Sequence, residues 1–135
     1  MKDCIFCKIV KGEIPCYKIY EDDKVLAFLD IANDVVGHTL VIPKQHAVNV
    51  LDASADTLHA VIDAVQKVSR HYVDNCGFDG VNTFNCNNLD AEQSVFHLHF
   101  HVIPRKKGDG VKVWKNQTQG NPTLQEVCDK LKLSN

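Results

Sequence analysis

The segment from His97 to Ile103 constrains the fold of this chain more than any other part of the sequence. It reads His-Leu-His-Phe-His-Val-Ile, so that imidazole and apolar side chains alternate. Successive side chains of a β-strand point to opposite faces of its sheet. We therefore predict a strand over 95–103 with His97, His99 and His101 together on one face. The opposite, core-facing side is expected to carry Phe96, Leu98, Phe100 and Val102.

The other hydrophobic patterns predict an α+β fold with an antiparallel sheet of about five strands, one long helix and a short C-terminal helix. Further strands are expected at 17–21, 25–29, 38–42 and 81–86. The long helix is predicted between Ser54, as its N-cap, and Gly77, just past its end. Its apolar stripe consists of Leu58, Val61, Ile62, Val65, Val68 and Tyr72. Asn121 and Pro122 predict the cap and first position of the short helix.

Length and composition fit a single domain over 1–135, with a core at about 4–115 and a C-terminal extension at 116–135. The net charge of -2 provides no general attraction for a nucleic acid polymer or an anionic membrane. No apolar run reaches the roughly 18 residues of a membrane span, and nothing at the N-terminus resembles a secretory signal. We therefore expect a cytoplasmic protein whose six cysteines are thiols or metal ligands.

Two kinds of chemistry suit three imidazoles on one strand face, and the strand alone does not choose between them. The histidines are either metal ligands or nucleophilic and acid-base groups, because an unperturbed pKa of about 6.5 leaves imidazole mostly neutral at pH 7. Cys4 and Cys7 form a Cys-x-x-Cys pair, which is half of a four-ligand zinc site. Two free thiols, behaving as small hydrophobic groups, are the alternative interpretation of that pair.

The histidine strand and the Gln93-Ser94-Val95-Phe96 segment before it resemble the signature of the histidine triad (HIT) family. Further matches follow in the family's order at 4–9, 12–15, 20–22, 27–31 and 37–46. The resemblance spans roughly residues 4–115 and looks closest to the Hint-like, purine-nucleoside phosphoramidase branch. Bacterial-type members of that branch continue to a tryptophan like Trp114.

The resemblance implies catalytic roles for His99, His101 and Ser94. His99 would be the nucleophile, because an imidazole with one nitrogen donating to a backbone carbonyl presents the lone pair of the other to phosphorus. Attack would form a nucleotidyl-histidine that water hydrolyses. His101 would contact the phosphate, and Ser94 would hydrogen-bond the phosphate or the leaving group. Without the resemblance, Ser94 is a turn residue before the strand.

The resemblance also implies a purine nucleotide site. Its residues are Phe6, Ile9, Phe28, Asp30, Ile31, Asn85, Cys86, Gln93, Ser94, Val95, His99 and His101. Asp30 would accept the ribose hydroxyls while the apolar side chains enclose the base. Two departures put substrate preference and turnover in doubt. Cys86 stands where the family usually has an asparagine, although Asn85 is adjacent, and Glu92 replaces a usual glycine beside the phosphate.

Zinc and self-association are the remaining implications of the resemblance. Many bacterial-type members complete the Cys4 and Cys7 pair with two histidines, which map here to His46 and His97. This Cys2His2 zinc would be structural and would separate His97 from the catalytic histidines. His38 would support the active site by hydrogen bonding. Family members are usually homodimers joined at sheet edges, so we expect a homodimer here.

Three alternative functions stay open at the level of sequence. The chain is a hydrolase of dinucleoside polyphosphates, as in the Fhit-like branch, or a nucleotide-binding protein with little turnover. In the third alternative, His97, His99 and His101 together hold one catalytic zinc. That arrangement leaves Cys4 and Cys7 unexplained.

Overall fold

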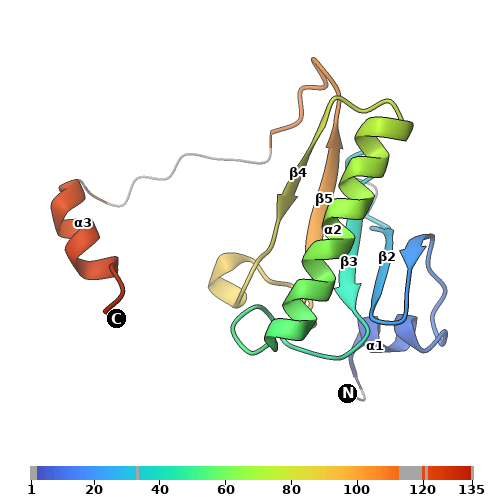
Figure 1. The fold of residues 1–135 in the computed structure, drawn as a ribbon, viewed down its shortest axis with the longest axis horizontal. Helices are drawn as coiled ribbons and strands as arrows, with labels where there is room; N and C mark the ends of the chain where they lie inside the picture. The colour runs from blue at the N-terminus through green and yellow to red at the C-terminus, as the bar shows by residue number, and fades with distance from the viewer. Residues whose placement is uncertain (1–2, 33, 113–119, 121, 135) are drawn as a thin grey trace.

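The structure is a computed structural model that describes residues 3–32, 34–112, 120 and 122–134. Its centre is a five-stranded antiparallel sheet in the order β1-β2-β3-β5-β4 (Figure 1). The strands are β1 (Lys18–Glu21), β2 (Val25–Leu29), β3 (Thr39–Pro43), β4 (Gly80–Phe84) and β5 (Phe100–Arg105). The helices are α1 (Ile5–Val10), α2 (Ala55–Asn75) and α3 (Leu124–Leu131), with a short 3-10 helix, η1 (Leu89–Ala91). The predicted α+β class is confirmed.

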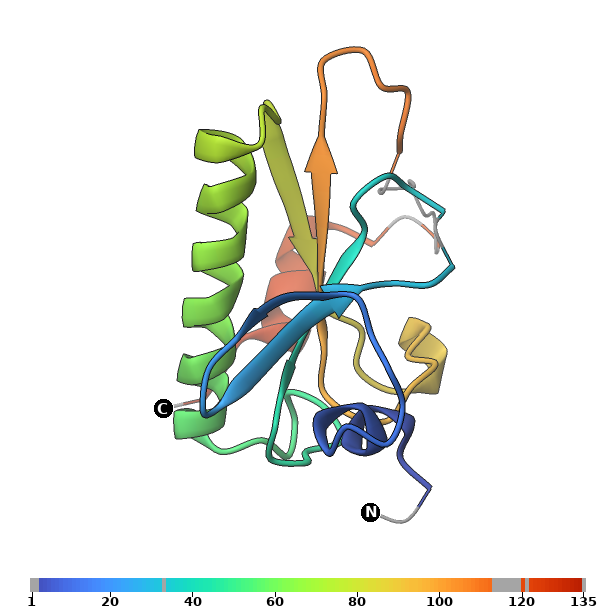
Figure 2. The same cartoon turned by 90° about the vertical axis from the view of Figure 1, so that its right-hand side faces the viewer.

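The central strands are buried on both faces, and their alternation divides the core into two layers. In β2, Val25 and Ala27 belong to the cluster beneath α2. Leu26 and Phe28, one residue out of step, belong to a second cluster with Phe6 of α1. Figure 2 shows α2 lying along one side of the sheet, away from α1. The period of two in this strand therefore decides which side chains meet which helix.

The register of β3 and β5 decides on which face His101 lies. Leu40 of β3 pairs with His101 of β5, and Leu40 belongs to the cluster of α1. Val102, the next residue of β5, is fully buried in the cluster beneath α2. His101 is thus on the face of the sheet opposite α2.

The long helix forms as predicted. Ser54 caps it by accepting a hydrogen bond from the Thr57 N–H at 3.1 Å. Gly77 follows its C-terminus with a φ of +81°, a conformation that suits glycine. Most of the predicted stripe is buried against the sheet, but Ile62 is 50% exposed on the outer side of the helix.

The predicted strand over 95–103 is wrong in its first half, because β5 begins only at Phe100. In the preceding segment, backbone groups form hydrogen bonds outside the strand ladder. The Leu98 N–H donates to the Ala47 carbonyl at 2.7 Å, and the Asn85 amide donates to the His99 carbonyl at 2.8 Å. Phe96 is consequently 47% exposed and does not join Leu98 in the core.

The two terminal helices also differ from the expectations. The C-terminal helix begins later than predicted, since Thr123 caps it by accepting a hydrogen bond from the Glu126 N–H. Asn121, the predicted cap, lies outside the described residues, as does Trp114. The N-terminal helix α1 was not predicted, and Cys4 is its cap. Across the described part of the chain, none of the helices has the length and apolar character to cross a membrane.

Candidate functional site

The three histidines of the motif make three different sets of contacts. His97 is fully buried and turns toward Cys4, Cys7 and His46, whereas His99 packs against Phe6. Only His101 lies in a strand. All three rings nevertheless lie on the side of the sheet opposite α2, since Phe6 of α1 contacts both the His97 and the His99 rings, and the His99 ring lies 5.0 Å from that of His101. The irregular segment before β5 keeps this common side but turns each imidazole toward a different set of partners.

His99 is held by a backbone hydrogen bond that determines which of its nitrogens is free. Its Nδ1–H donates to the His97 carbonyl at 2.8 Å, which leaves the lone pair on Nε2. The ring stands edge-on to Phe6, with centroids 5.3 Å apart, and lies 5.0 Å from the His101 ring. Burial lowers the pKa of His99, so its neutral form is favoured. A neutral, oriented imidazole is the state that a nucleophile requires.

His101 belongs to a hydrogen-bonded chain that ends on a carboxylate. Its Nδ1 lies 2.8 Å from Nε2 of His38, and Nδ1 of His38 lies 2.7 Å from Oδ1 of Asp34. The His101 ring also stacks on Phe84, with centroids 4.3 Å apart. Burial lowers the pKa of His101 to about 4. Sequence reasoning found His38 through the resemblance but missed Asp34, whose signal is only its position four residues before His38.

The metal ligands that the resemblance predicted come together in space. Donor atoms of Cys4, Cys7, His46 and His97 all lie within 4.8 Å of one another. α1 presents the two thiols, and Sγ of Cys4 also caps that helix by accepting from the Cys7 N–H. The Nε2–H of His97 donates to the Pro43 carbonyl at 2.8 Å, which directs Nδ1 toward the thiols. Burial raises the pKa of Cys7.

The spacing of these atoms fits a tetrahedral zinc ion. Zinc bonds of about 2.3 Å to sulfur and about 2.0 Å to nitrogen place the ligand atoms of a tetrahedral site roughly 3.3–3.8 Å apart. The Cys4 Sγ–His97 Nδ1 and Cys7 Sγ–His46 Nδ1 distances are both 3.3 Å, and the two Nδ1 atoms are 3.2 Å apart. His99 and His101 take no part in this cluster, which argues against one zinc held by the three motif histidines.

The residues expected to bind the nucleoside lie on the same side of the sheet as His101. The Phe6 and Phe28 rings are 5.6 Å apart and edge to face, and Ile9 is half-buried against their cluster. Asp30 follows β2 and keeps a partly exposed carboxylate, one oxygen of which accepts a hydrogen bond from the Ala32 N–H. Ile31 is 86% exposed, so the core does not need it.

Gln93 is buried and its side chain is fully occupied by the protein itself. Its Oε1 accepts hydrogen bonds from the Asn49 amide and the Asn88 N–H, and its Nε2 donates to the Val48 and Val95 carbonyls. The resemblance placed Gln93 among the nucleotide contacts. In the structure its amide joins the loop after β3 to the loop between β4 and β5. Ser94, next to it, is exposed and lines a hollow of about 560 Å³ together with Val95.

The two departures from the family pattern lie in the loop between β4 and β5. Cys86 is half-buried, while the neighbouring Asn85 donates to the His99 carbonyl at 2.8 Å. Glu92 is exposed and has a φ of +69°, where a residue other than glycine costs about 1 kcal/mol. Asn88 has φ +77° and ψ +159°, a region used almost only by glycine. The loop therefore holds two strained residues where its contacts with Asn49 and Gln93 anchor it.

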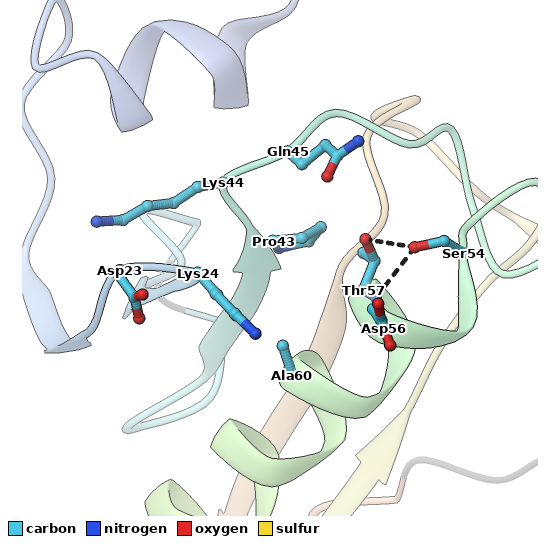
Figure 3. A pocket seen from close by; sticks show the side chains of 9 residues that line it. All are labelled: Asp23, Lys24, Pro43, Lys44, Gln45, Ser54, Asp56, Thr57 and Ala60. Atoms are coloured by element: carbon cyan, nitrogen blue, oxygen red, sulfur yellow. Dashed lines mark hydrogen bonds between the residues drawn. The ribbon is translucent and has the colours of Figure 1, made fainter.

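A separate hollow of about 360 Å³ lies between the β1–β2 turn, the end of β3 and the start of α2 (Figure 3). Lys24, Lys44, Asp23 and Asp56 line it, so its charges are mixed. None of the residues that the sequence assigned to catalysis, nucleotide binding or metal binding lines this hollow. This hollow is therefore separate from the predicted site residues.

The fold and the site define an antiparallel α+β domain with a histidine motif at the start of β5. In a comparison with known families, residues 11–108 match the family model of the HIT domain. The chain belongs to the HIT family. Cys4, Phe6, Cys7 and Ile9 precede the matched segment, so their roles depend on the geometry described above.

Relatives of known name and structure support this assignment. Protein hit of Bacillus subtilis is 51% identical over 116 residues, covering 84% of this chain and 80% of that protein. An adenosine 5′-monophosphoramidase of Schizosaccharomyces pombe is 45% identical over 102 residues, covering 76% and 74%. The crystal structure of a Zn-bound histidine triad family protein from Mycobacterium smegmatis is 37% identical with a TM-score of 0.79, covering 87% of this chain and 85% of that one.

Proposed function

We propose that the protein hydrolyses purine nucleoside 5′-phosphoramidates, or related nucleotidyl conjugates, to the nucleoside monophosphate. The observation that carries this proposal is the hydrogen bond from His99 Nδ1 to the His97 carbonyl, which leaves Nε2 as the nucleophilic nitrogen. A relative named adenosine 5′-monophosphoramidase supports the substrate class.

The reaction proceeds by two displacements at phosphorus. The Nε2 lone pair of His99 forms a bond to the α-phosphorus as the phosphorus–nitrogen bond to the amine breaks, and the departing amine takes a proton from solvent. The oxygen of a water molecule then forms a bond to phosphorus as the phosphorus–Nε2 bond breaks, which releases the monophosphate and returns a proton to solvent. His101 and Ser94 hold the phosphate oxygens, where hydrogen bonds stabilise the charge of the transition state. Asp30 binds the ribose hydroxyls, and Phe6 and Phe28 contact the base.

Single-turnover mass spectrometry tests the mechanism. Adenosine 5′-phosphoramidate is mixed with the protein and quenched in alkali, which preserves phosphohistidine bonds. We expect an AMP adduct on His99 and at least a 10³-fold loss of kcat in His99→Ala, the size typical of removing a nucleophile. His59→Ala changes an exposed histidine of α2 and serves as the control. Full activity of His99→Ala contradicts the proposal.

The two alternative activities are tested with the same protein. Diadenosine polyphosphate hydrolysed faster than the phosphoramidate favours the Fhit-like function. Binding of AMP without turnover of either substrate favours a nucleotide-binding protein, with Cys86 and Glu92 as the first residues to revert. Cys86→Asn and Glu92→Gly would then restore turnover.

We further propose that Cys4, Cys7, His46 and His97 hold a structural zinc ion. When bound, zinc supplies a cross-link between α1, the loop after β3 and the segment before β5, all of which border the nucleotide site. Metal analysis should find about one zinc per chain, and Cys7→Ser should lose it while Cys128→Ser, at an exposed thiol, retains it. A chelator that leaves the melting temperature unchanged would contradict a structural role.

We also propose that the protein forms a homodimer. β4 is an edge strand of the sheet, and the neighbouring α2 exposes Ile62 (50%) and Val73 (39%). Pairing of such edges in a second copy satisfies their backbone hydrogen bonds. Light scattering at micromolar concentration should give a dimer mass that Ile62→Glu lowers and Leu51→Glu, an exposed site elsewhere, does not. A monomer mass for the unaltered protein contradicts this part.

A further inference from the structure

Asp34 lies in the loop between β2 and β3. It is connected through His38 to His101, the histidine proposed to bind the phosphate. Its Oδ1 is 2.7 Å from Nδ1 of His38 and also accepts the Val35 N–H at 3.0 Å. Nε2 of His38 is 2.8 Å from Nδ1 of His101. His38 is only 7% exposed, whereas the side chain of Asp34 is 58% exposed. The three side chains therefore form a continuous hydrogen-bonded row.

The carboxylate at one end determines where the protons lie. Ionised Asp34 only accepts hydrogen bonds, so Nδ1 of His38 carries a hydrogen. If His38 is neutral, its Nε2 has a lone pair and must accept from Nδ1–H of His101. Nε2 of His101 is then also a lone pair. That nitrogen would repel a phosphate oxygen, which has lone pairs of its own.

One proton added to His38 reverses the direction of the hydrogen bond between His38 and His101. With both nitrogens of His38 protonated, Nε2–H of His38 donates to Nδ1 of His101, and the hydrogen of His101 moves to Nε2. His101 then donates to an anion while it stays neutral itself. Burial lowers the pKa of His101 to about 4, which favours its neutral form.

Two carboxylates lie beside the charge that this arrangement places on His38. Asp34 contacts Nδ1 at 2.7 Å, and Oδ2 of Asp30, which follows β2, is 3.8 Å from Nε2. The other titratable neighbours are His101 and His99 from the β5 side. Of the two carboxylates, only Asp34 makes a hydrogen bond to the ring.

We propose that Asp34 is a positioning residue that keeps His38 protonated in the nucleotide complex and so makes His101 a hydrogen-bond donor to the substrate phosphate. This inference rests on the proposed function, since it assumes that His101 meets a phosphate. It assigns to Asp34 an electrostatic role that the histidine motif by itself does not contain.

Proton uptake on nucleotide binding is the direct test, because it does not depend on turnover. Calorimetry of AMP binding at pH 7.5 in buffers of different ionisation enthalpy gives the number of protons taken up. We expect about one proton for the unaltered protein and clearly less for Asp34→Asn, which keeps a hydrogen-bond acceptor without the charge. Asp63→Asn removes an exposed charge of α2 and should behave like the unaltered protein.

Kinetics and spectroscopy provide two further measurements on variants of Asp34. The alkaline limb of the kcat profile should move to lower pH by about one unit in Asp34→Asn, with partial rescue in Asp34→Glu. Nitrogen-15 shifts of His101 should report a hydrogen on Nε2 in the AMP complex of the unaltered protein and its loss in Asp34→Ala. A merely structural role for Asp34 would change stability without moving either quantity.

The outcomes separate this inference from the proposed function. Equal proton uptake and equal pH profiles in Asp34→Asn and the unaltered protein overturn the role of Asp34 and leave phosphoramidate hydrolysis standing. Absence of AMP binding to the unaltered protein overturns both. Proton uptake that depends on Asp34 in a protein that does not hydrolyse phosphoramidates supports the inference while the proposed reaction fails.

Discussion

Replacement of Gln93 by methionine tests whether the loops around the proposed nucleotide site are held by one buried amide. Gln93 is 1% exposed and makes four hydrogen bonds. Their distances are 3.1 Å from the Asn49 amide, 2.8 Å from the Asn88 N–H, 2.7 Å to the Val48 carbonyl and 3.0 Å to the Val95 carbonyl. Methionine has nearly the same volume, so the change removes these bonds and creates little cavity.

The expected loss follows from the number of partners. A hydrogen bond contributes about 1 kcal/mol net, so four bonds amount to about 4 kcal/mol, and more where a partner stays buried without a replacement. This is a large part of the roughly 5–15 kcal/mol that stabilises a typical domain. Because Val95 adjoins Ser94, we also expect weaker AMP binding.

Urea unfolding followed by circular dichroism measures this effect. Gln66→Met, at an exposed position of α2, is the matched control and should change the unfolding free energy by less than about 0.5 kcal/mol. Gln93→Glu is a second variant of similar shape that replaces the donating amide with a carboxylate facing two carbonyl oxygens. A loss below about 1 kcal/mol in Gln93→Met, with AMP affinity unchanged, would refute the reasoning.

Three other predictions use single positions. Gly37→Ala should lower the unfolding free energy by about 2 kcal/mol or more, because φ is +81° and the new Cβ would lie 2.6 Å from Cγ of Pro104. Gly12→Ala, at φ +80° with nothing within 4 Å, should show the backbone strain alone, so equal losses would exclude the clash. Burial lowers the pKa of His101 to about 4, so the unfolded chain takes up the proton first and stability should fall between pH 6.5 and 4. His101→Gln should flatten that part of the urea-midpoint profile, and an unchanged slope would contradict the cause. Ile31→Ala should weaken AMP binding with no change in melting temperature, since Ile31 is 86% exposed; unchanged affinity would remove it from the site.

Most of the regular structure was predictable from local sequence patterns. The apolar run of β2 and the three-and-four spacing of α2 gave these elements within one residue of their observed bounds. The capping side chain of Ser54 was equally local, because it bonds a backbone group three residues away. Helix α1 escaped prediction because its single cap is a cysteine and its six residues are too few for a helical period.

Only the family resemblance predicted that four metal ligands come together, namely Cys4, Cys7, His46 and His97. Residue types supplied half of a zinc site, and spacing in the chain said nothing about the other half. The ligands come from α1, the loop after β3 and the segment before β5, so their meeting depends on how the sheet is assembled.

By itself, the sequence determined the α+β class, the alternation of the central strands and the presence of a histidine motif, because periodicity acts between neighbours along the chain. Only the tertiary structure decided that His97, His99 and His101 face different partners. The carbonyls and amides that replace the strand ladder before Phe100 come from segments far away in sequence. The same long-range closure brings His38 to His101, whereas Asp34 reaches His38 within a single loop, four residues away.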